Sequence, residues 1–441
     1  MAAVPAAQAG SHPGKARLVY PRLTIPFILL LLCFAAWGSA ANLTDVLVGV
    51  FRSIFVMSNF QSALVQFAYY GAYFSLAIPA ALINRRYGYK VGVLTGLGLA
   101  SIGGLLFIPA SELLVYEFFL LALFVLAAGL SILETSANPF VIAMGPEESA
   151  TQRLNLAQSF NPVGANIGVL LGAVLILPQI TSDAAKTIMT PAELEQSQEA
   201  DLALVLGPYL GIAAVLIAIW LLIAFIKMET PAERSQEEEG VQSGALGRLW
   251  RNRHYRYGVA AQFFNVAAQV CAWTFTIQYA QDVVGVDTAD SGWFLQASLI
   301  VFLLSRFLMT YLLGIFRPTK LLFVMGSLGV AFCLIAMFSE NMVGLLAVVA
   351  ISFSLSLMFP TIYGVALRGL GEDTKFGAAG LVMAILGGAI VPLIHGKLMD
   401  EVGAALAYAV PGVCLALVAC YALFDLRTNR EGGPLVVEGA H

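Results

Sequence analysis

Residues 114–143 read LVYEFFLLALFVLAAGLSILETSANPFVIA, and Glu134 lies deep inside this apolar run. About 20 apolar residues cross the roughly 30 Å of bilayer hydrocarbon as a helix, so the stretch is typical of a membrane span. Asp45 lies in the same way within the apolar run 25–50. An ionised side chain at the bilayer centre costs roughly 2.5–3.5 kcal/mol even on lenient scales, so such acids usually face a cavity and have a function there. The two acids predict a proton-coupled transporter. The alternative is an acid satisfied by a neighbouring helix, or one that lies at the membrane interface.

The composition of the whole chain is that of a polytopic membrane protein. The 441 residues are 59% hydrophobic and 11% charged, with a mean hydropathy of +0.84. No water-soluble domain of this length would tolerate such a composition. We therefore predict an all-α membrane protein of about twelve transmembrane helices. The expected spans are 25–50, 62–83, 91–109, 114–143, 154–177, 206–226, 257–279, 291–314, 320–338, 342–367, 377–394 and 404–423.

A long polar segment, 227–256, divides the predicted spans into two sets of six. It contains the run Glu237-Glu238-Glu239 and has the composition of a linker. The predicted organisation is an N-terminal tail (1–23), a six-helix bundle (24–226), a linker (227–256), a second six-helix bundle (257–424) and a C-terminal tail (425–441).

The basic residues predict the orientation of the chain. If the N-terminus is cytoplasmic, 19 of the 23 Lys and Arg residues fall on that side, and only Arg52, Lys186 and Lys397 fall on the other. This is the bias of the positive-inside rule, so both termini are expected in the cytoplasm. The first twenty residues lack the pattern of a signal peptide, so the first span is expected to be retained. The net charge of −4, without a basic patch, gives no sign of a nucleic-acid partner.

Several classes of function are excluded by what the sequence lacks. The five cysteines have no Cys-x-x-Cys spacing and no histidine cluster beside them, so we expect no disulfide and no metal site. They are interpreted as small packing residues. No nucleophile–base set, phosphate-binding loop or sizeable soluble domain is recognisable. We therefore expect a protein that is not an enzyme and uses no cofactor.

Polar residues form stripes at helical spacing within several predicted spans. Amides facing lipid would be unsatisfied, so these faces are expected to point into the bundle. Carboxamides suit hydroxyl groups and an indole suits the apolar face of a pyranose, which favours a neutral polyol as the ligand. The alternative for each amide is an interhelical hydrogen bond. The candidate binding residues are Trp37, Asn42, Gln158, Asn161, Gln262, Asn265, Gln269 and Trp273.

Other residues of the spans have weaker signals. Arg306 could pair with a carbonyl, gate the cytoplasmic side or snorkel to the interface. His395 is expected at the membrane interface, near an external helix end. Gly164, Gly168 and Gly172 recur every four residues, which predicts close helix packing.

Short blocks of distinctive sequence extend over nearly the whole transmembrane region. They are NLTD (42–45), LETSANPF (133–140), GPE (145–147), RLNLAQSFN (153–161), AQF (261–263), AQ (268–269), Trp273, FPTI (359–362) and GEDTK (371–375). In these blocks the chain resembles the fucose permease family of the major facilitator superfamily.

The resemblance implies two six-helix bundles around a central site, alternating access, and import of a monosaccharide, first L-fucose, with a proton. It implies that Asp45 and Glu134 couple the proton and that Gln158 and Asn161 line the sugar site. It also implies a multi-pass protein of the cell inner membrane. We expect it to work as a monomer surrounded by membrane lipid.

The chain departs from the resemblance at two positions. Asn84 stands where the superfamily has an acid in the loop between spans two and three, and Phe359 stands where a tyrosine is expected. The lost phenolic hydroxyl could change sugar preference, so a glucose or galactose transporter of the same family is an alternative. A proton-driven exporter is a further alternative, although it would lead us to expect a more hydrophobic cavity.

Overall fold

The structure is a computed structural model that describes residues 17–54, 59–113, 115–171, 179, 181, 189–228 and 244–428. Within these ranges every regular element is a helix, which confirms the predicted fold class. The side chains of residues 44–67 lie outside the description.

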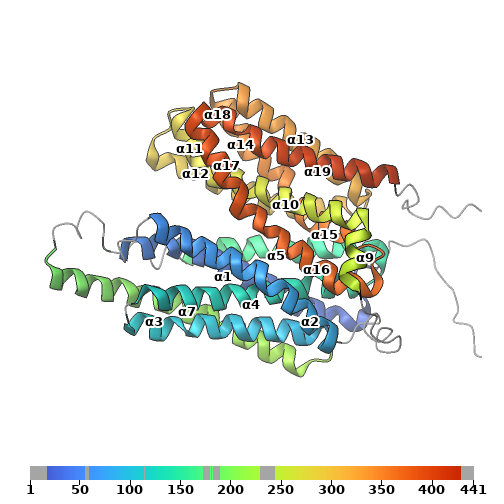
Figure 1. The fold of residues 1–441 in the computed structure, drawn as a ribbon, viewed down its shortest axis with the longest axis horizontal. Coiled ribbons are helices and arrows are strands. Elements are labelled where there is room, and N and C mark those ends of the chain that lie inside the picture. The colour runs from blue at the N-terminus through green and yellow to red at the C-terminus, as the bar shows by residue number, and fades with distance from the viewer. Residues whose placement is uncertain are drawn as a thin grey trace, which may run out of the picture.

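The first half of the chain forms one layer of helices, coloured blue to green in Figure 1. It consists of η1 (Pro21–Leu23), α1 (Thr24–Ile54), α2 (Asn59–Leu105), α3 (Phe107–Leu113), α4 (Tyr116–Ala143), η2 (Glu147–Ser149), α5 (Ala150–Leu171) and α7 (Pro191–Phe225).

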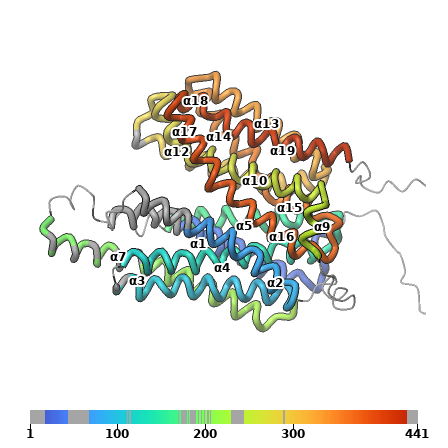
Figure 2. The backbone as a smooth tube through the Cα atoms, in the orientation of Figure 1, coloured from blue at the N-terminus to red at the C-terminus, as the bar shows by residue number. Residues whose placement is uncertain are grey.

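The second half forms the other layer, coloured yellow to red, and Figure 2 traces the backbone through both layers. It consists of α9 (Ala245–Arg251), α10 (Arg253–Thr274), α11 (Thr276–Asp282), α12 (Thr288–Leu312), α13 (Pro318–Phe338), α14 (Met342–Leu355), α15 (Met358–Ala366), η5 (Gly371–Asp373), α16 (Thr374–Met383), η6 (Ala384–Leu386), α17 (Gly387–Val402), α18 (Ala404–Ala407) and α19 (Ala409–Thr428).

Nine stretches of the described residues are long and apolar enough to cross a membrane. The sequence predicts twelve spans, and the difference has two causes. Helix α2 carries two predicted spans in one run, which bends at Gly88, where φ is 84° and ψ is 167°. Glycine adopts this positive φ without the clash that a side chain would meet. Helices α5 and α10 also correspond to predicted spans. Both carry polar side chains, and the described part of α5 ends at Leu171, short of the predicted end at residue 177.

The segment predicted as a linker is partly helical. Its residues 229–243 lie outside the described residues, whereas α9 and the first turn of α10 occupy its second part. The paired hydrogen bonds of Arg248 with Asp373, with N···O distances of 2.8 and 2.6 Å, connect α9 to η5.

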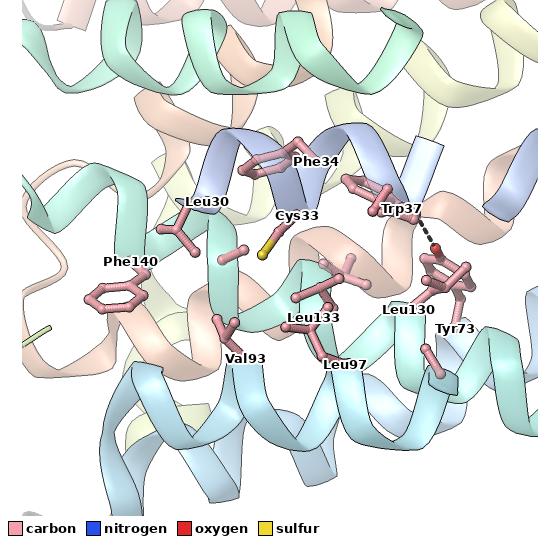
Figure 3. Close-up of a cluster of buried hydrophobic side chains, with 14 of the residues drawn as sticks. Leu30, Cys33, Phe34, Trp37, Tyr73, Val93, Leu97, Leu130, Leu133 and Phe140 are labelled. Carbon is pink, nitrogen blue, oxygen red and sulfur yellow. Dashed lines mark hydrogen bonds between the residues drawn. The ribbon is translucent and has the colours of Figure 1, made fainter. Parts of the chain in front are cut away.

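The N-terminal bundle has an apolar core where α1, α2 and α4 meet. Figure 3 shows Cys33 of α1 pointing toward the other two helices, whose Leu97 and Leu133 belong to the same buried cluster. Cys33 is buried, as its interpretation as a packing residue predicts. These side chains pack against one another and hold the three helices together as one unit.

Helices α1 and α5 approach to backbone contact. A Cβ atom added to Gly164 would clash with the carbonyl of Ala35, and one added to Gly168 would clash with the carbonyl of Ser39. The prediction of close packing is thus confirmed at these two glycines, while Gly172 lies outside the described residues.

Replacing Gly164 by alanine is expected to destabilise the protein by about 1–3 kcal/mol, because overpacking forces the two helices apart. Gly211 of α7 is the matched control, since a Cβ atom there would meet nothing within 4 Å. Thermal unfolding in detergent should show a lowered midpoint for Gly164→Ala and no lowering of the midpoint for Gly211→Ala. Equal midpoints in both variants would contradict the packing.

The two bundles contact each other at one end of the molecule. Helix α16 packs against α2 and α4, and α12 and α15 pack against α5. Figure 1 shows the layers converging toward the end that holds α9 and α16, and diverging toward the end that holds α18. We call the converging end, formed by α9, η5 and residues 84–90, the α9 end.

Candidate functional site

Glu134 is one of the buried residues of α4. Its side chain is 1% exposed, and neither carboxyl oxygen meets a hydrogen-bond partner among the described residues. An ionised carboxylate without a partner is costly in such surroundings, whereas the protonated form carries no charge. Glu134 therefore has the environment of a group that gains and loses a proton.

Asp45 lies on α1, as predicted, but its side chain belongs to the part outside the description. The nearby Asn42 is partly buried, and its amide donates to the carbonyl of Gly38 at 3.0 Å. This bond runs back along its own helix. The structure therefore places both residues on α1, and the amide of Asn42 bonds within its own helix.

Gln158 connects three helices. Its Nε2 atom donates to Oδ1 of Asn138 on α4 at 2.8 Å, and Asn138 lies one turn beyond Glu134. Its backbone carbonyl accepts from Nη1 of Arg306 on α12 at 2.6 Å. Gln158 thus links the helix of the buried acid to the opposite bundle.

Arg306 is buried, with 5% of its surface exposed. The predicted pairing with a carbonyl is confirmed, and snorkelling to the interface is wrong. The guanidinium stays inside because the Gln158 carbonyl accepts one N–H and the ring of Phe302 lies 4.7 Å from its Cζ atom.

Further polar contacts join the two bundles along α5. Nδ2 of Asn155 donates to Oγ1 of Thr361 at 3.2 Å, and the hydroxyls of Ser159 and Thr310 lie 3.4 Å apart. Asn161, the next candidate along this face, is half-buried, and its backbone carbonyl lies against Gly38.

The candidate amides of α10 lie within the C-terminal bundle. Gln262 and Asn265 are completely buried, and all four of their amide atoms lack a hydrogen-bond partner among the described residues. Gln269 and Trp273, further along the same helix, are half-buried. Buried amides are almost always satisfied, so this unpaired set marks a place where a polar ligand could bind.

The two candidate tryptophans differ in their surroundings. Trp37 donates from Nε1 to the Tyr73 hydroxyl at 2.9 Å and is 9% exposed, at the edge of the apolar core in Figure 3. Trp273 donates from Nε1 to Oγ of Ser352 at 3.0 Å. The half-buried Trp273 is therefore the better placed of the two to contact a ligand.

Residues 84–90 contact the other bundle through aromatic rings. The Cζ atom of Arg85 lies 5.6 Å from the ring of Phe376, and Nζ of Lys375 lies 5.4 Å from the ring of Tyr89. Asn84 is buried, and its Nδ2 atom donates to the carbonyl of Thr135 at 3.4 Å. In the segment where Asn84 replaces the acid of the superfamily pattern, cation–π contacts thus join the two bundles.

His395, expected at the membrane interface, is buried inside the protein. The imidazole is fully buried and stacks on Phe275, with ring centroids 4.4 Å apart and planes at 18°. Tyr408 lies edge-on to it, at 5.3 Å. The flat imidazole is accommodated because rings from the junction between α10 and α11 and from the turn after α18 meet it there.

Sequence reasoning missed several residues of this region. Asn138 contacts Gln158, Ser352 contacts Trp273 and Thr361 contacts Asn155, yet none of the three was among the candidate binding residues. Asn138 shares a helix face with Glu134, whereas Ser352 and Thr361 have no distinctive spacing. Only their partners on distant helices reveal them. The one available signal was the position of Asn138 four residues after Glu134.

Comparison with known proteins agrees with this architecture. Residues 27–385 match the family described as the Major Facilitator Superfamily. The chain is 39% identical over 412 residues to the L-fucose-proton symporter of Escherichia coli (strain K12), covering 92% of this chain and 94% of that one. It is 34% identical over 401 residues to a glucose/galactose transporter of Brucella abortus biovar 1 (strain 9-941), covering 90% and 93%.

A solved structure agrees as well. The crystal structure of the Major Facilitator Superfamily transporter FucP in the outward conformation superposes with a TM-score of 0.86 at 38% identity, covering 91% of this chain and 99% of that one. The match includes both bundles, so the helices of this chain form an integral membrane protein. The chain belongs to the Major Facilitator Superfamily and, within it, to the fucose permease family.

Proposed function

We propose that the protein imports a monosaccharide, first L-fucose, together with a proton. The observation that carries the proposal is the combination of a buried, unpaired carboxyl group at Glu134 with the unpaired buried amides of Gln262 and Asn265. The amides offer donors and acceptors to sugar hydroxyls, and the acid offers a site for the proton. The identity of 39% to an L-fucose-proton symporter, against 34% to a glucose/galactose transporter, supports the choice of sugar.

The orientation follows from the charges at the α9 end. Arg85, Arg86, Lys90, Arg251 and Arg253 lie at this end of the molecule, so the positive-inside rule assigns it to the cytoplasm. Both termini then lie in the cytoplasm, and the protein resides in the cell inner membrane as a monomer surrounded by lipid. The bundles meet at the cytoplasmic end, which corresponds to a state that receives sugar from outside.

Alternating access requires the contacts between the bundles to open. The hydrogen bonds from Arg306 to Gln158 and from Asn155 to Thr361 would break as the cytoplasmic side opens. Each is a single bond, worth about 0.5–1.5 kcal/mol net for the neutral Asn155 pair and about 1.5–3 kcal/mol for the charged Arg306, so bound sugar and proton can shift the balance. Coupling requires the proton to bind the two states unequally. Protonation of Glu134, of Asp45 or of both would remove charge from the site and ease closure around the sugar.

The test is uptake of labelled L-fucose into proteoliposomes under an inward proton gradient. We expect accumulation that a protonophore abolishes and that excess unlabelled L-fucose blocks, with glucose and galactose much weaker as competitors. Absence of protonophore-sensitive accumulation of any of the three sugars would contradict sugar and proton import. Net efflux driven by the gradient would establish an exporter instead.

A glucose or galactose transporter is the second candidate, and Phe359 is the observation that favours it. Its ring stacks with Tyr363, at a centroid distance of 6.2 Å and an interplanar angle of 21°, beside the α5 contact of Thr361. A phenyl ring offers no hydrogen bond to a sugar hydroxyl, and a site lacking such a bond loses discrimination. Stronger competition by glucose or galactose than by L-fucose in the same uptake assay would favour this candidate.

A further inference from the structure

The indole of Trp273 is held at two points inside the C-terminal bundle. Its N–H donates to Oγ of Ser352 on α14 at 3.0 Å, and its ring stands perpendicular to Phe302 of α12, with centroids 5.0 Å apart. Both partners are buried: Ser352 is completely buried, and the side chain of Phe302 is 4% exposed. One contact fixes the polar edge of the indole and the other fixes its plane, so the ring has a defined orientation.

Phe302 makes a second contact that leads out of the bundle. The guanidinium of Arg306, one helical turn further along α12, lies over its ring, with Cζ 4.7 Å from the centroid. Nη1 of Arg306 then donates to the carbonyl of Gln158 on α5, in the other bundle, at 2.6 Å. An unbroken series of contacts thus runs from Ser352 through Trp273 and the two α12 side chains to the N-terminal bundle.

We propose that Ser352 and Phe302 are positioning residues for Trp273, and that Arg306 makes the orientation of the indole depend on the contact between the bundles. This rests on the proposed function, and on Trp273 as the ring that meets the apolar face of the sugar. While α5 and α12 touch, the guanidinium is anchored and Phe302 keeps its place. When the cytoplasmic side opens, Arg306 loses its acceptor, and the support behind the indole is released.

The consequence is a difference in sugar affinity between the two states. Stacking on an aromatic ring depends on a parallel approach of the two faces, so an indole that is free to tilt binds the sugar less well. The site then holds the sugar more tightly while it faces outside and less tightly when it faces the cytoplasm. A ligand that distinguishes the states in this way also shifts their equilibrium.

The hydroxyl of Ser352 has a close comparison on the same helix. Ser354 lies two residues away and is equally buried, but its hydroxyl meets no hydrogen-bond partner among the described residues. Any general effect of removing a buried hydroxyl from α14 is therefore present in Ser354→Ala. Only Ser352→Ala also removes the acceptor of the indole N–H.

The experiment compares Ser352→Ala, Ser352→Thr and Ser354→Ala in two assays. The first is the emission of Trp273 without sugar, taken as the difference between each variant and the same variant carrying Trp273→Phe. The second is the concentration dependence of L-fucose uptake. For Ser352→Ala we expect a shifted emission maximum and a KM raised about five-fold, the effect of one lost hydrogen bond, with kcat changed less. Ser352→Thr retains the hydroxyl, so we expect the emission maximum and KM of the wild type. Ser354→Ala is expected to leave both values unchanged.

Phe302→Leu extends the test to the second support of the indole. It should shift the Trp273 emission and raise KM in the same direction, whereas Phe338→Leu, at a residue 75% exposed at the end of α13, should change neither. Equal behaviour of Ser352→Ala and Ser354→Ala in both assays would overturn the inference.

The two readouts separate this inference from the proposed function. If the wild-type protein carries no L-fucose, the proposed function fails, but the sugar-free emission still reports whether Ser352 holds the indole. If L-fucose uptake is normal and Ser352→Ala leaves both emission and KM unchanged, the inference fails and the proposed function stands.

Discussion

Replacing Glu134 by glutamine is expected to abolish uphill accumulation of sugar while leaving exchange of sugar across the membrane. Glutamine has nearly the shape of the protonated acid but cannot release a proton. The carboxyl group it replaces is buried and unpaired among the described residues, so no ion pair is broken. A carrier that is neutral at this position can still bind sugar and change state, but the proton gradient no longer drives it.

The expected effect is large. A gradient of one pH unit is worth about 1.4 kcal/mol, which supports about ten-fold accumulation by a carrier that moves one proton with each sugar. Glu134→Gln should only equalise the inside and outside concentrations, while counterflow of labelled against unlabelled sugar persists. Glu117→Gln is the control, because this acid lies on the exposed first turn of the same helix. Gradient-driven accumulation by Glu134→Gln equal to that of Glu117→Gln would refute the coupling role.

Replacing Arg153 by alanine is expected to cost about 3–5 kcal/mol of stability, the range found when a buried charged network is broken. The guanidinium is completely buried at the start of α5. It donates at 2.7 Å to the carbonyls of Val141 and Leu18 and at 2.9 Å to the hydroxyl of Ser149. The carbonyls of Ile142, Gly145 and Pro146 accept from it as well.

This one side chain joins the segment before α1 to the connection between α4 and α5. Its removal leaves several buried carbonyl groups without a donor, and each costs about 1–3 kcal/mol before the structure relaxes. Thermal unfolding in detergent should show a strongly lowered midpoint for Arg153→Ala, or the variant should fail to accumulate in the membrane at all. Arg153→Lys, which retains the charge but has fewer donors, should lie between it and the wild type. Arg22→Ala, at an exposed residue, is the control. A midpoint for Arg153→Ala equal to that of Arg22→Ala would contradict the role of the network.

Hydropathy alone predicts the helical membrane fold, because apolar runs of span length recur along the whole chain. It could not predict that α2 joins two spans across a bend, since only the backbone angles at Gly88 show where the direction changes. The start of α10 also differs, at Arg253 rather than at residue 257. Basic and aromatic residues that precede a span carry no apolar signal, even when they continue its helix.

Within the candidate site, the sequence identified residues whose type is unusual inside a membrane, such as Glu134, Gln262 and Arg306. It could not identify residues whose role comes from a partner far away in the chain. Ser352 is ordinary in a membrane helix until Trp273 donates to it. His395 was misjudged for the same reason, although here the sequence suggested an exposed position for a buried residue. Its aromatic neighbours are distant in sequence, so nothing near it indicated a buried position.

The choice between the two candidate tryptophans also required the fold. Trp37 and Trp273 both occur at helical spacing beside polar residues, so the sequence treats them alike. The structure separates them, because Trp37 packs at the edge of the N-terminal core whereas Trp273 is half-buried. The roles of Asp45, Glu134 and the amides remain proposals, and they are tested by transport.

The central claim is that sugar and proton move together, and the movement of the proton can be recorded directly. L-fucose is added outside de-energised proteoliposomes in a weakly buffered medium, and the external pH is followed. We predict that the sugar makes the medium more alkaline, that a protonophore collapses the change, and that Glu134→Gln vesicles give no change although they exchange sugar. Entry of labelled L-fucose into wild-type vesicles without any change of external pH would contradict the account.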